Sequence, residues 1–308
     1  VHREAVLAVL AELGVSVDGR PVTTRIDLHR LPARAREMVG AGDVLWLSDG
    51  VRLVARDDHN GHARAGAVRV ARGERLLGDG RTAWVATDDQ GRLQPLDARS
   101  GLRRGEAAST GERVVMRAVD EGGRYAWQLT GCLPEPRSCP TGQRLTRPAG
   151  GEGAAPVRLR AGVVTGMAVG QRFLWLIARD PAGRGRVERR DRRSGRLLRV
   201  TPLARPATSV AVGPRGAWVV DRRGALVRVS VGGRARAVSE GIATVAARGG
   251  QLWAMRADRR GIVRVDPGTG RVRAEATSPV PLAVPLAITA RHVWALSHSG
   301  RALVRVAR

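Results

Sequence analysis

The chain has 308 residues, of which 43% are hydrophobic and 26% charged, and this composition supports a folded protein with one large core or two small ones. It excludes a disordered tail, a collagen-like rod and a small disulfide-framework peptide. No apolar stretch approaches the roughly 18 uninterrupted residues of a membrane-spanning helix, so we expect no bilayer insertion through this segment.

The charge is unusual, because all 53 basic residues are arginine and only 28 residues are acidic, for a formal net charge of +25. Residues 1–100 carry 15 arginines and 14 acids, residues 101–200 carry 20 and 9, and residues 201–308 carry 18 and 5. The net charge therefore rises along the chain from +1 to +11 and +13. Such a field attracts polyanions of any kind without selecting one.

The N-terminal stretch predicts one helix. Residues 3–13 (REAVLAVLAEL) contain an apolar stretch and are followed by Gly14, which is typical of a short helix that ends there. Glu4 and Glu12 fall at or within the apolar run, and no small-x-small cleavage site follows. We expect residues 1–20 to be a helix packed on the domain or a linker stub from an upstream domain, with a degenerate export signal as the alternative.

Seven tryptophans divide the chain into units separated by 38, 43, 48, 43, 35 and 41 residues. They are Trp46, Trp84, Trp127, Trp175, Trp218, Trp253 and Trp294. Short apolar runs and glycine-rich turns at this period predict the blades of a β-propeller, whereas helical repeats would show a 3.6-residue period. Because each indole occupies the same place in its unit, we expect buried side chains between sheets, with the indole N–H on a neighbouring carbonyl.

Each unit predicts four strands. Segments such as 164–177, 207–220 and 284–297 predict two strands joined by a short turn, with the tryptophan on the second. The third strand is nearly copied between 225–231, 261–267 and 302–308. An Asp-x-x-Ser/Thr-Gly turn follows it at Asp97, Asp191 and Asp266, and the fourth strand comes next.

The last unit is one strand short, because the chain ends at Arg308 after its third strand. Residues 21–30 alternate apolar and polar from Val22 to Leu28, as a half-buried strand does. An unpaired sheet edge invites aggregation, so we expect this N-terminal strand to be the outer strand of the last blade. The prediction is an all-β, seven-bladed β-propeller of four-stranded antiparallel blades over residues 21–308.

The repeats G-x-x-W-V and x-V-x-R-V-D-P-x-T-G resemble those of the YVTN-type seven-bladed propellers, over roughly residues 33–308. Streptogramin-lyase and quinoprotein propellers are more distantly similar. The resemblance implies the architecture but no ligand. Streptogramin-lyase-like enzymes would use a metal, acidic residues and a histidine base, but no catalytic residue of that family can be carried over. The acids at the expected blade tips are typical of turns. They are Asp49, Asp88, Asp180, Asp221 and Asp258.

The segment at residues 56–62 holds the sharpest local cluster. Asn60-Gly61 is typical of a two-residue hairpin, which would place His59 opposite His62 and put Asp57 on the same face. Two imidazoles and a carboxylate are ligands for Zn²⁺ or another divalent ion. The alternative is a solvated hairpin tip with Asp57 paired to Arg64. We expect no cofactor other than this candidate metal.

Six residues lie between Cys132 and Cys139 in the third unit, a spacing that does not match a zinc ribbon. A disulfide closing this loop would stabilise the fold by roughly 2.5 kcal/mol and would indicate an oxidising compartment. The alternative is two free thiols in a cytoplasmic protein. We expect an extracytoplasmic protein.

An arginine-rich run at residues 183–199 and arginines in later units predict a basic surface over blades four to six. Its candidate ligand-binding residues are Arg189, Arg190, Arg222, Arg223, Arg256, Arg259 and Arg260. Three functions follow in order of preference. The first is a non-catalytic monomeric propeller whose loops and channel bind a partner protein or a small ligand. The second is a binder of nucleic acid or anionic glycan, and the third is a metal-dependent lyase or a quinone-dependent oxidoreductase.

Overall fold

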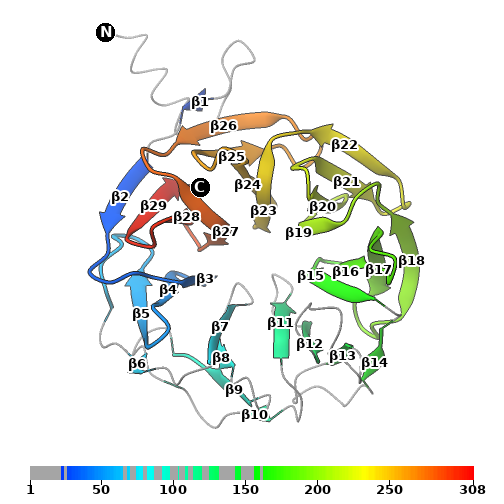
Figure 1. The fold of residues 1–308 in the computed structure, drawn as a ribbon, viewed down its shortest axis with the longest axis horizontal. Coiled ribbons are helices and arrows are strands. Elements are labelled where there is room, and N and C mark those ends of the chain that lie inside the picture. Colours follow the sequence, from blue (N-terminus) through cyan, green and yellow to red (C-terminus); the bar gives the residue numbers. More distant parts are fainter. Residues whose placement is uncertain are drawn as a thin grey trace.

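The computed structural model describes residues 22–23, 26–64, 68–69, 74–78, 82–86, 92–97, 103, 108–109, 114–119, 125–131, 143–146, 156–159 and 162–308. Seven sheets surround a common axis (Figure 1), which confirms the predicted all-β, seven-bladed propeller. In the described part of the chain, no helix has the length and apolar character to cross a membrane. The helix expected at residues 3–13 and the pair Cys132 and Cys139 lie outside the described residues.

In each blade the first strand lies at the axis and each following strand pairs antiparallel with the one before it (Figure 1). Blades one to three contain β3 (Glu37–Ala41), β4 (Val44–Ser48), β5 (Arg52–Asp57) and β6 (Val68–Arg69); β7 (Arg75–Gly78), β8 (Ala83–Ala86), β9 (Arg92–Pro95) and β10 (Ala108–Ser109); and β11 (Val114–Val119), β12 (Ala126–Thr130), β13 (Arg144–Thr146) and β14 (Val157–Arg158).

Blades four to seven repeat this pattern, with two N-terminal strands added at the outside of the last two blades. Their strands are β15 (Val163–Val169), β16 (Phe173–Arg179), β17 (Gly185–Asp191) and β18 (Leu197–Pro202); β19 (Ala207–Gly213), β20 (Gly216–Asp221), β21 (Leu226–Ser230) and β22 (Ala235–Ser239); β23 (Ile242–Arg248), β24 (Gln251–Arg256), β25 (Gly261–Val265) and β26 (Val272–Thr277) with β1 (Val22–Thr23); and β27 (Leu282–Ile288), β28 (His292–Ser297) and β29 (Ala302–Ala307) with β2 (Ile26–Arg30).

The N-terminal strand closes the ring, as predicted, because β2 pairs antiparallel with β29 and completes blade seven. The predicted single strand over residues 21–30 is wrong in its extent. β1 pairs parallel with β26 and adds a fifth strand to blade six, whose outer edge offers unpaired backbone groups. Ile26 packs against the core, whereas Leu28, two residues further along β2, is 44% exposed.

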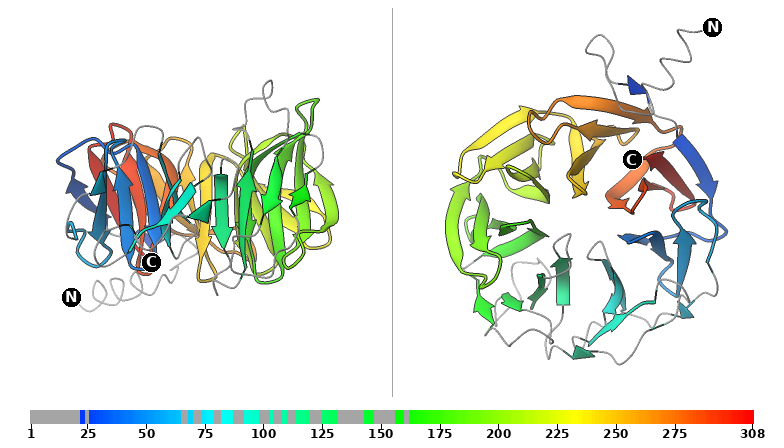
Figure 2. Two further views of the ribbon diagram at one scale, coloured as in Figure 1. Left: turned by 90° about the horizontal axis from the view of Figure 1, so that it is seen from below. Right: turned by 180° about the vertical axis from the view of Figure 1, so that it is seen from behind.

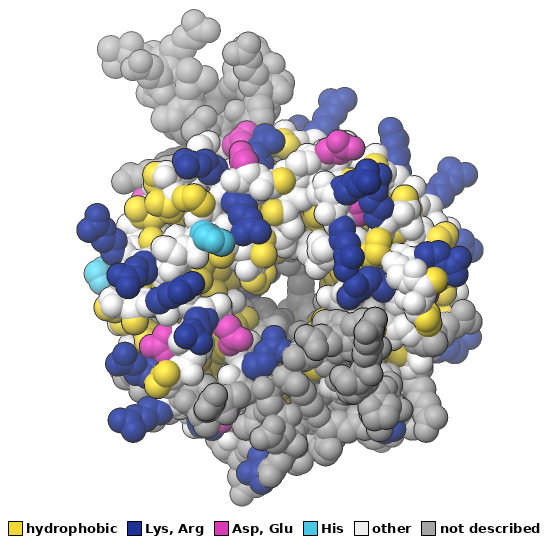
Figure 3. All heavy atoms as spheres, in the orientation of Figure 1, with side chains coloured by type: hydrophobic (Ala, Val, Ile, Leu, Met, Phe, Trp, Pro, Cys, Tyr) yellow, Lys and Arg dark blue, Asp and Glu magenta, His cyan; other side chains and the backbone are white. Residues whose placement is uncertain are grey.

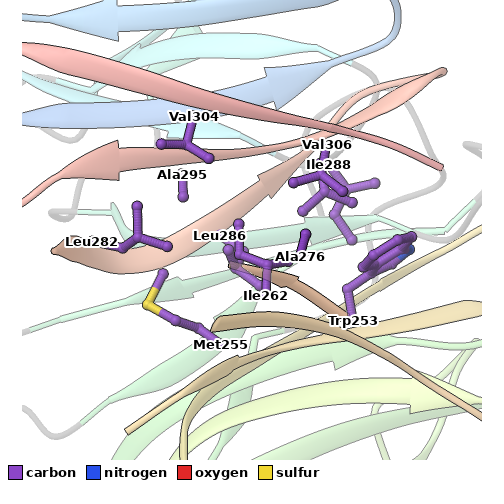
Figure 4. Close-up of a cluster of buried hydrophobic side chains, with 11 residues drawn as sticks. Trp253, Met255, Ile262, Ala276, Leu282, Leu286, Ile288, Ala295, Val304 and Val306 are labelled. Atoms are coloured by element: carbon purple, nitrogen blue, oxygen red, sulfur yellow. The ribbon is translucent and has the colours of Figure 1, made fainter. Parts of the chain in front are cut away.

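The core is divided among the contacts between neighbouring blades. Within the described residues, seven clusters of buried apolar side chains each combine residues of two adjacent blades. Figure 4 shows the cluster between blades six and seven, in which Met255 lies near Leu282 and Trp253 lies toward Ile288 and Val306. Each blade is therefore stabilised by its two neighbours, and the ring needs a closed seam between the first blade and the last.

The seven tryptophans all lie on second strands, as predicted, and six of them are almost completely buried. Trp127 shows the expected contact between blades, because its indole N–H donates to the Arg192 carbonyl in blade four at 2.9 Å. Burying an indole removes a large apolar area from water, so these residues dominate the packing between sheets.

Candidate functional site

A cavity of about 970 Å³ occupies the ring axis. First strands of all seven blades line it, and they do so near their ends at the A–B loops, which join first and second strands. The C-terminal Arg308 also lines the cavity, and Figure 2 shows the C-terminus at this end of the ring. Small-molecule sites in proteins have volumes of about 300–1,000 Å³.

The cavity wall combines apolar side chains with positive charge. Among the lining residues that the structure describes, four are arginine and none is aspartate or glutamate. The arginines are Arg117, Arg172, Arg248 and Arg308, and the apolar wall includes Met38, Val39, Met167, Val169, Val210, Val212, Leu286 and Ile288. Guanidinium groups match carboxylates and phosphates in geometry and charge, so the wall favours ligands with a negative group and an apolar body.

Two of these arginines also hold blades together at the A–B end. Arg248 Nη1 donates to the carbonyls of Gly42 and Ile288 at 3.3 and 3.1 Å. Arg308 donates to the carbonyl of Ala290 at 3.1 Å and to that of Arg248 at 2.7 Å. These bonds join blades six, seven and one around the mouth of the cavity.

Gly40 sets how closely the first and last blades approach at the axis. A Cβ atom at this position would lie 2.4 Å from the Ile288 carbonyl oxygen, which belongs to the backbone of blade seven. Any larger residue would push these two first strands apart.

The C–D turns, which join third and fourth strands, share one hydrogen-bond pattern in blades one, four and six. In blade four, Asp191 Oδ1 accepts the N–H groups of Arg193 and Ser194 at 3.0 and 2.7 Å, and the Gly195 N–H donates to the Asp191 carbonyl. The turns that begin at Asp57 and Asp266 repeat these bonds. The segment 57–61 is thus the Asp-x-x-Ser/Thr-Gly turn with asparagine at its fourth position.

This pattern corrects the predicted hairpin of the metal candidates. The Asp57 N–H donates to the His62 carbonyl, so Asp57 lies opposite His62, and His59 does not. The reason is that Asp57 caps the turn and lengthens it, with only Gly61 at positive φ. The Asp57 carboxylate accepts from Arg64 at 2.6 Å, and His59 Nδ1 lies 3.2 Å from Arg291 Nη1. No group of three metal-ligating side chains occurs within the residues that the structure covers.

Asp58 links blade one to blade seven at the same turn, a role that sequence reasoning missed. Its buried carboxylate accepts from the indole N–H of Trp294 at 3.1 Å, from the Arg291 N–H at 2.8 Å and from the Thr289 hydroxyl. His292 Nδ1 lies 3.0 Å from it and donates, because a carboxylate only accepts. Arg192 is the second residue of its C–D turn, as Asp58 is, and its backbone carbonyl accepts the indole N–H of Trp127. An alignment of the turns could therefore have indicated the contact of Asp58 with Trp294.

The four hydrogen bonds control the charge of Asp58. Burial raises the pKa of this carboxyl, but its hydrogen bonds outweigh burial and hold the pKa at about 2, below the usual 3.8. Asp58 is therefore ionised at neutral pH and stabilises the contact between blades seven and one.

In blades four to seven, the tryptophan of the second strand lies directly opposite an arginine of the third strand. The pairs are Trp175–Arg189, Trp218–Arg228, Trp253–Arg264 and Trp294–Arg305. Three of these arginines donate to carbonyls in the next C–D turn. Arg189 donates to the Val231 carbonyl, Arg228 to the Gly268 carbonyl and Arg305 to the His59 carbonyl. Part of the arginine excess in the second half of the chain therefore holds adjacent blades together.

The predicted basic surface is divided between the two ends of the ring. The B–C loops, which join second and third strands, carry four exposed arginines in blades five and six: Arg222, Arg223, Arg259 and Arg260. Arg256 beside them forms an ion pair with Glu275 at 2.6 Å. Figure 3 looks onto this end, where arginines are spread over the surface with some acidic side chains among them.

Two of the predicted residues do not belong to that surface. Arg189 and Arg190 lie at the end of β17 near the C–D turn, and this end is opposite because the strands of a blade alternate in direction. Arg190 is buried and forms an ion pair with Glu188 at 2.7 Å, and Arg189 is half-buried.

Four acids at the blade tips form turns, as predicted. Asp49, Asp180, Asp221 and Asp258 each accept backbone N–H groups of their own B–C loop. Asp88 lies outside the described residues.

These features define a seven-bladed β-propeller with an apolar, arginine-bearing cavity on its axis. No family model matches the sequence, and no curated protein matches it either. Solved structures that are similar are propellers. Virginiamycin B lyase from Staphylococcus aureus has a TM-score of 0.66 at 10% identity, over 92% of this chain and 100% of that one.

Two further solved structures are similar to this chain. The β-propeller domain of Cps50 (Swd1) from Myceliophteria thermophila has a TM-score of 0.64 at 12% identity, over 92% of this chain and 100% of that one. BamB from Moraxella catarrhalis has a TM-score of 0.52 at 17% identity, over 88% and 84%. At these identities the likeness shows the fold alone.

Proposed function

We propose that this propeller is a non-catalytic scaffold that binds a small ligand, or a short segment of a partner protein, in the axial cavity. The observation that carries the proposal is the cavity itself, which all seven first strands line with apolar side chains and arginines. Ligand sites of proteins combine such a concave apolar wall with a few polar groups. The β-propeller fold commonly serves as a scaffold for protein interactions.

A neutral dye tests this proposal. N-phenyl-1-naphthylamine fluoresces when it enters an apolar site, and we expect it to bind at one site per chain. Ala168→Trp would fill the cavity from its wall, so we expect this variant to lose at least 90% of the fluorescence signal. Val51→Trp, at an exposed position in a B–C loop, is the matched control. Dye binding that survives Ala168→Trp would contradict the proposal.

A second function is supported by the exposed arginines of the B–C loops in blades five and six. Their positive charge would bind polyanions such as nucleic acid or anionic glycans with strong salt dependence. Retention on a heparin column tests this function. We expect the quadruple exchange of Arg222, Arg223, Arg259 and Arg260 to Glu to abolish retention. Unchanged retention would reject this surface.

Several predictions remain part of this proposal. They are membership of the YVTN-type repeat family, an extracytoplasmic location, a disulfide between Cys132 and Cys139, and a monomeric state. The sequence repeats support the first, and the two cysteines with six residues between them support the disulfide and the location. Thiol titration of natively isolated protein tests the disulfide, and two free thiols would contradict it.

A further inference from the structure

Blade four carries an arginine pair that is directly apposed across two strands. Arg189 on β17 lies opposite Arg199 on β18, and Trp175 on β16 lies opposite Arg189, so the three side chains form a row on one face of the sheet. Like charges placed directly opposite each other on a sheet destabilise it. Blade five repeats this pair with Arg228 opposite Arg236, so what distinguishes blade four is the further group beside its pair.

A third guanidinium converges on the same place from the A–B loop. The Cζ atoms of Arg172 and Arg189 lie 5.5 and 4.8 Å from the centroid of the Phe173 ring. Arg172 and Phe173 both line the axial cavity, and so does Val231, whose carbonyl accepts from Arg189. The cationic group is therefore at the edge of the cavity, beside an aromatic ring.

No carboxylate among the described residues forms an ion pair with these three arginines. Asp191 is the next acidic residue on β17, and its Oδ1 accepts hydrogen bonds from the backbone N–H and the hydroxyl of Ser194 in the C–D turn. Burial lowers the pKa of the Arg189 guanidinium, and the charges of Arg199 and Arg172 lower it further. The carbonyls of Val231 and Gly232 orient Arg189 and Arg199 but do not neutralise them.

Blade seven shows how the same row is neutralised when it serves only the fold. There the third-strand arginine, Arg305, lies opposite Asp27 and forms an ion pair with it at 2.5 Å. Blade four has Arg199 at the place of Asp27. Its row therefore lacks the carboxylate of blade seven, and Arg172 adds a third positive charge beside it.

We propose that Arg172, Arg189 and Arg199 form an anion-binding subsite at the edge of the axial cavity. This inference rests on the proposed function and names its ligand class: a small organic anion whose phosphate, sulfonate or carboxylate lies among the three guanidinium groups. The apolar body of the ligand lies against Phe173 and the cavity wall. Guanidinium groups bind such anions through charge-assisted hydrogen bonds, and a nearby ring adds apolar contact.

A matched pair of dyes isolates the anionic group. 8-Anilino-1-naphthalenesulfonate carries the aromatic body of N-phenyl-1-naphthylamine plus a sulfonate. We expect the sulfonate dye to bind the folded chain at least tenfold more tightly than the neutral dye. In the double variant Arg172→Gln/Arg199→Gln we expect this ratio to fall below threefold, with the neutral dye unchanged. Arg301→Gln, an exposed arginine between β28 and β29 at the other end of the ring, is the control and should keep the full ratio.

The outcomes separate this inference from the proposed function. If the neutral dye binds in the cavity and the sulfonate dye binds no more tightly, the anion subsite is rejected while the cavity stands. A ratio that survives the double variant, or that falls equally in Arg301→Gln, also rejects it. Competition identifies the source of affinity, because phenyl phosphate should displace the sulfonate dye at least tenfold better than inorganic phosphate. Equal displacement would overturn the apolar part of the subsite.

Discussion

Two contacts between blades contain the same row of a tryptophan and an arginine on neighbouring strands. One is the seam between blades seven and one, and the other is the contact between blades four and five. The rows differ in the residue on the outer strand, which is an aspartate in the first and an arginine in the second. In both, a third-strand arginine donates to a carbonyl in the next C–D turn. At the seam Arg305 is neutralised by Asp27, whereas in blade four Arg189 lies opposite Arg199. The arginine of the third strand therefore belongs to the fold, whereas the residue opposite it on the outer strand differs between blades. It is Asp27 in blade seven, Arg199 in blade four and Arg236 in blade five, and only in blade four do Arg172 and Phe173 lie beside the row.

The largest effect should come from removing the outer strand of the seam. Deletion of residues 1–30 removes β1 and β2 and leaves Arg305 and the edge of β29 uncovered. Domains are stable by about 5–15 kcal/mol, and we expect the deletion to remove roughly 4 kcal/mol or more of the free energy of unfolding measured in urea. Deletion of residues 1–21, which keeps both strands, is the control. Equal urea midpoints for the two shortened chains would reject closure by β2.

The second effect concerns the carboxylate of Asp58 in the C–D turn of blade one. The corresponding turn of blade five has no acidic residue. Asp58→Asn removes the charge that its four donors stabilise and should lower the free energy of unfolding at pH 7 by about 2–3 kcal/mol. Because the folded-state pKa of about 2 lies below the unfolded value, this stabilisation is complete above pH 4 and is lost as the pH falls through 2. The wild-type chain should therefore lose more stability than the variant between pH 4 and pH 2.

A control separates this network from ordinary turn capping. Asp49→Asn alters a carboxylate that caps an exposed B–C loop, and we expect it to cost about 1 kcal/mol or less. Equal losses in the two variants would show that Asp58 acts only as a cap.

The third prediction converts the seam into a copy of blade four. Asp27→Arg places a second guanidinium opposite Arg305 and removes their ion pair. We expect a loss of about 1–2 kcal/mol, since both groups are partly exposed and solvent screens them. Urea unfolding at low salt and at 1 M salt measures it, and the loss should shrink at high salt. A loss that does not depend on salt would contradict the electrostatic account of the row.

The smallest effect comes from the reverse exchange. Arg199→Asp gives blade four the ending of the seam, so the free energy of unfolding should rise by about 0.5–1 kcal/mol. The same variant should lose the preference for the sulfonate dye. Arg236→Asp makes the same exchange opposite Arg228 in blade five, away from Phe173, and should keep that preference. A variant of Arg199 that binds the sulfonate dye as the wild type does would show that the row is not open to a ligand.

The repeat could be predicted from the sequence because it depends on local patterns. The spacing of the indoles predicted the blades, and the alternation around Ile26 predicted a closing strand. The extent of the closing strand could not be predicted, because Val22 and Thr23 pair with β26 of blade six, an edge that the local sequence does not indicate. Local patterns state which residues form strands but not which edges meet.

The candidate site was less accessible to sequence reasoning, because its contacts join residues far apart in the chain. Asp58 and His292 meet across the seam, and nothing local to either residue indicates the other. The predicted arginine surface combined residues from both ends of the ring, since a basic run does not reveal where each loop lies. The arginine opposite the tryptophan in blades five to seven was visible in the third-strand copies, and comparison of blades could have assigned it to packing.

Hydrogen exchange of the unmodified chain tests most directly whether the seam makes the ring one cooperative unit. The amides of β29 that point toward β2 should exchange as slowly as the amides of β21 that point toward β22, since each pair is the outer half of a complete blade. If the β29 amides instead exchange at the rate of unprotected backbone while those of β21 stay protected, β2 does not close the ring, and the account of the seam is wrong.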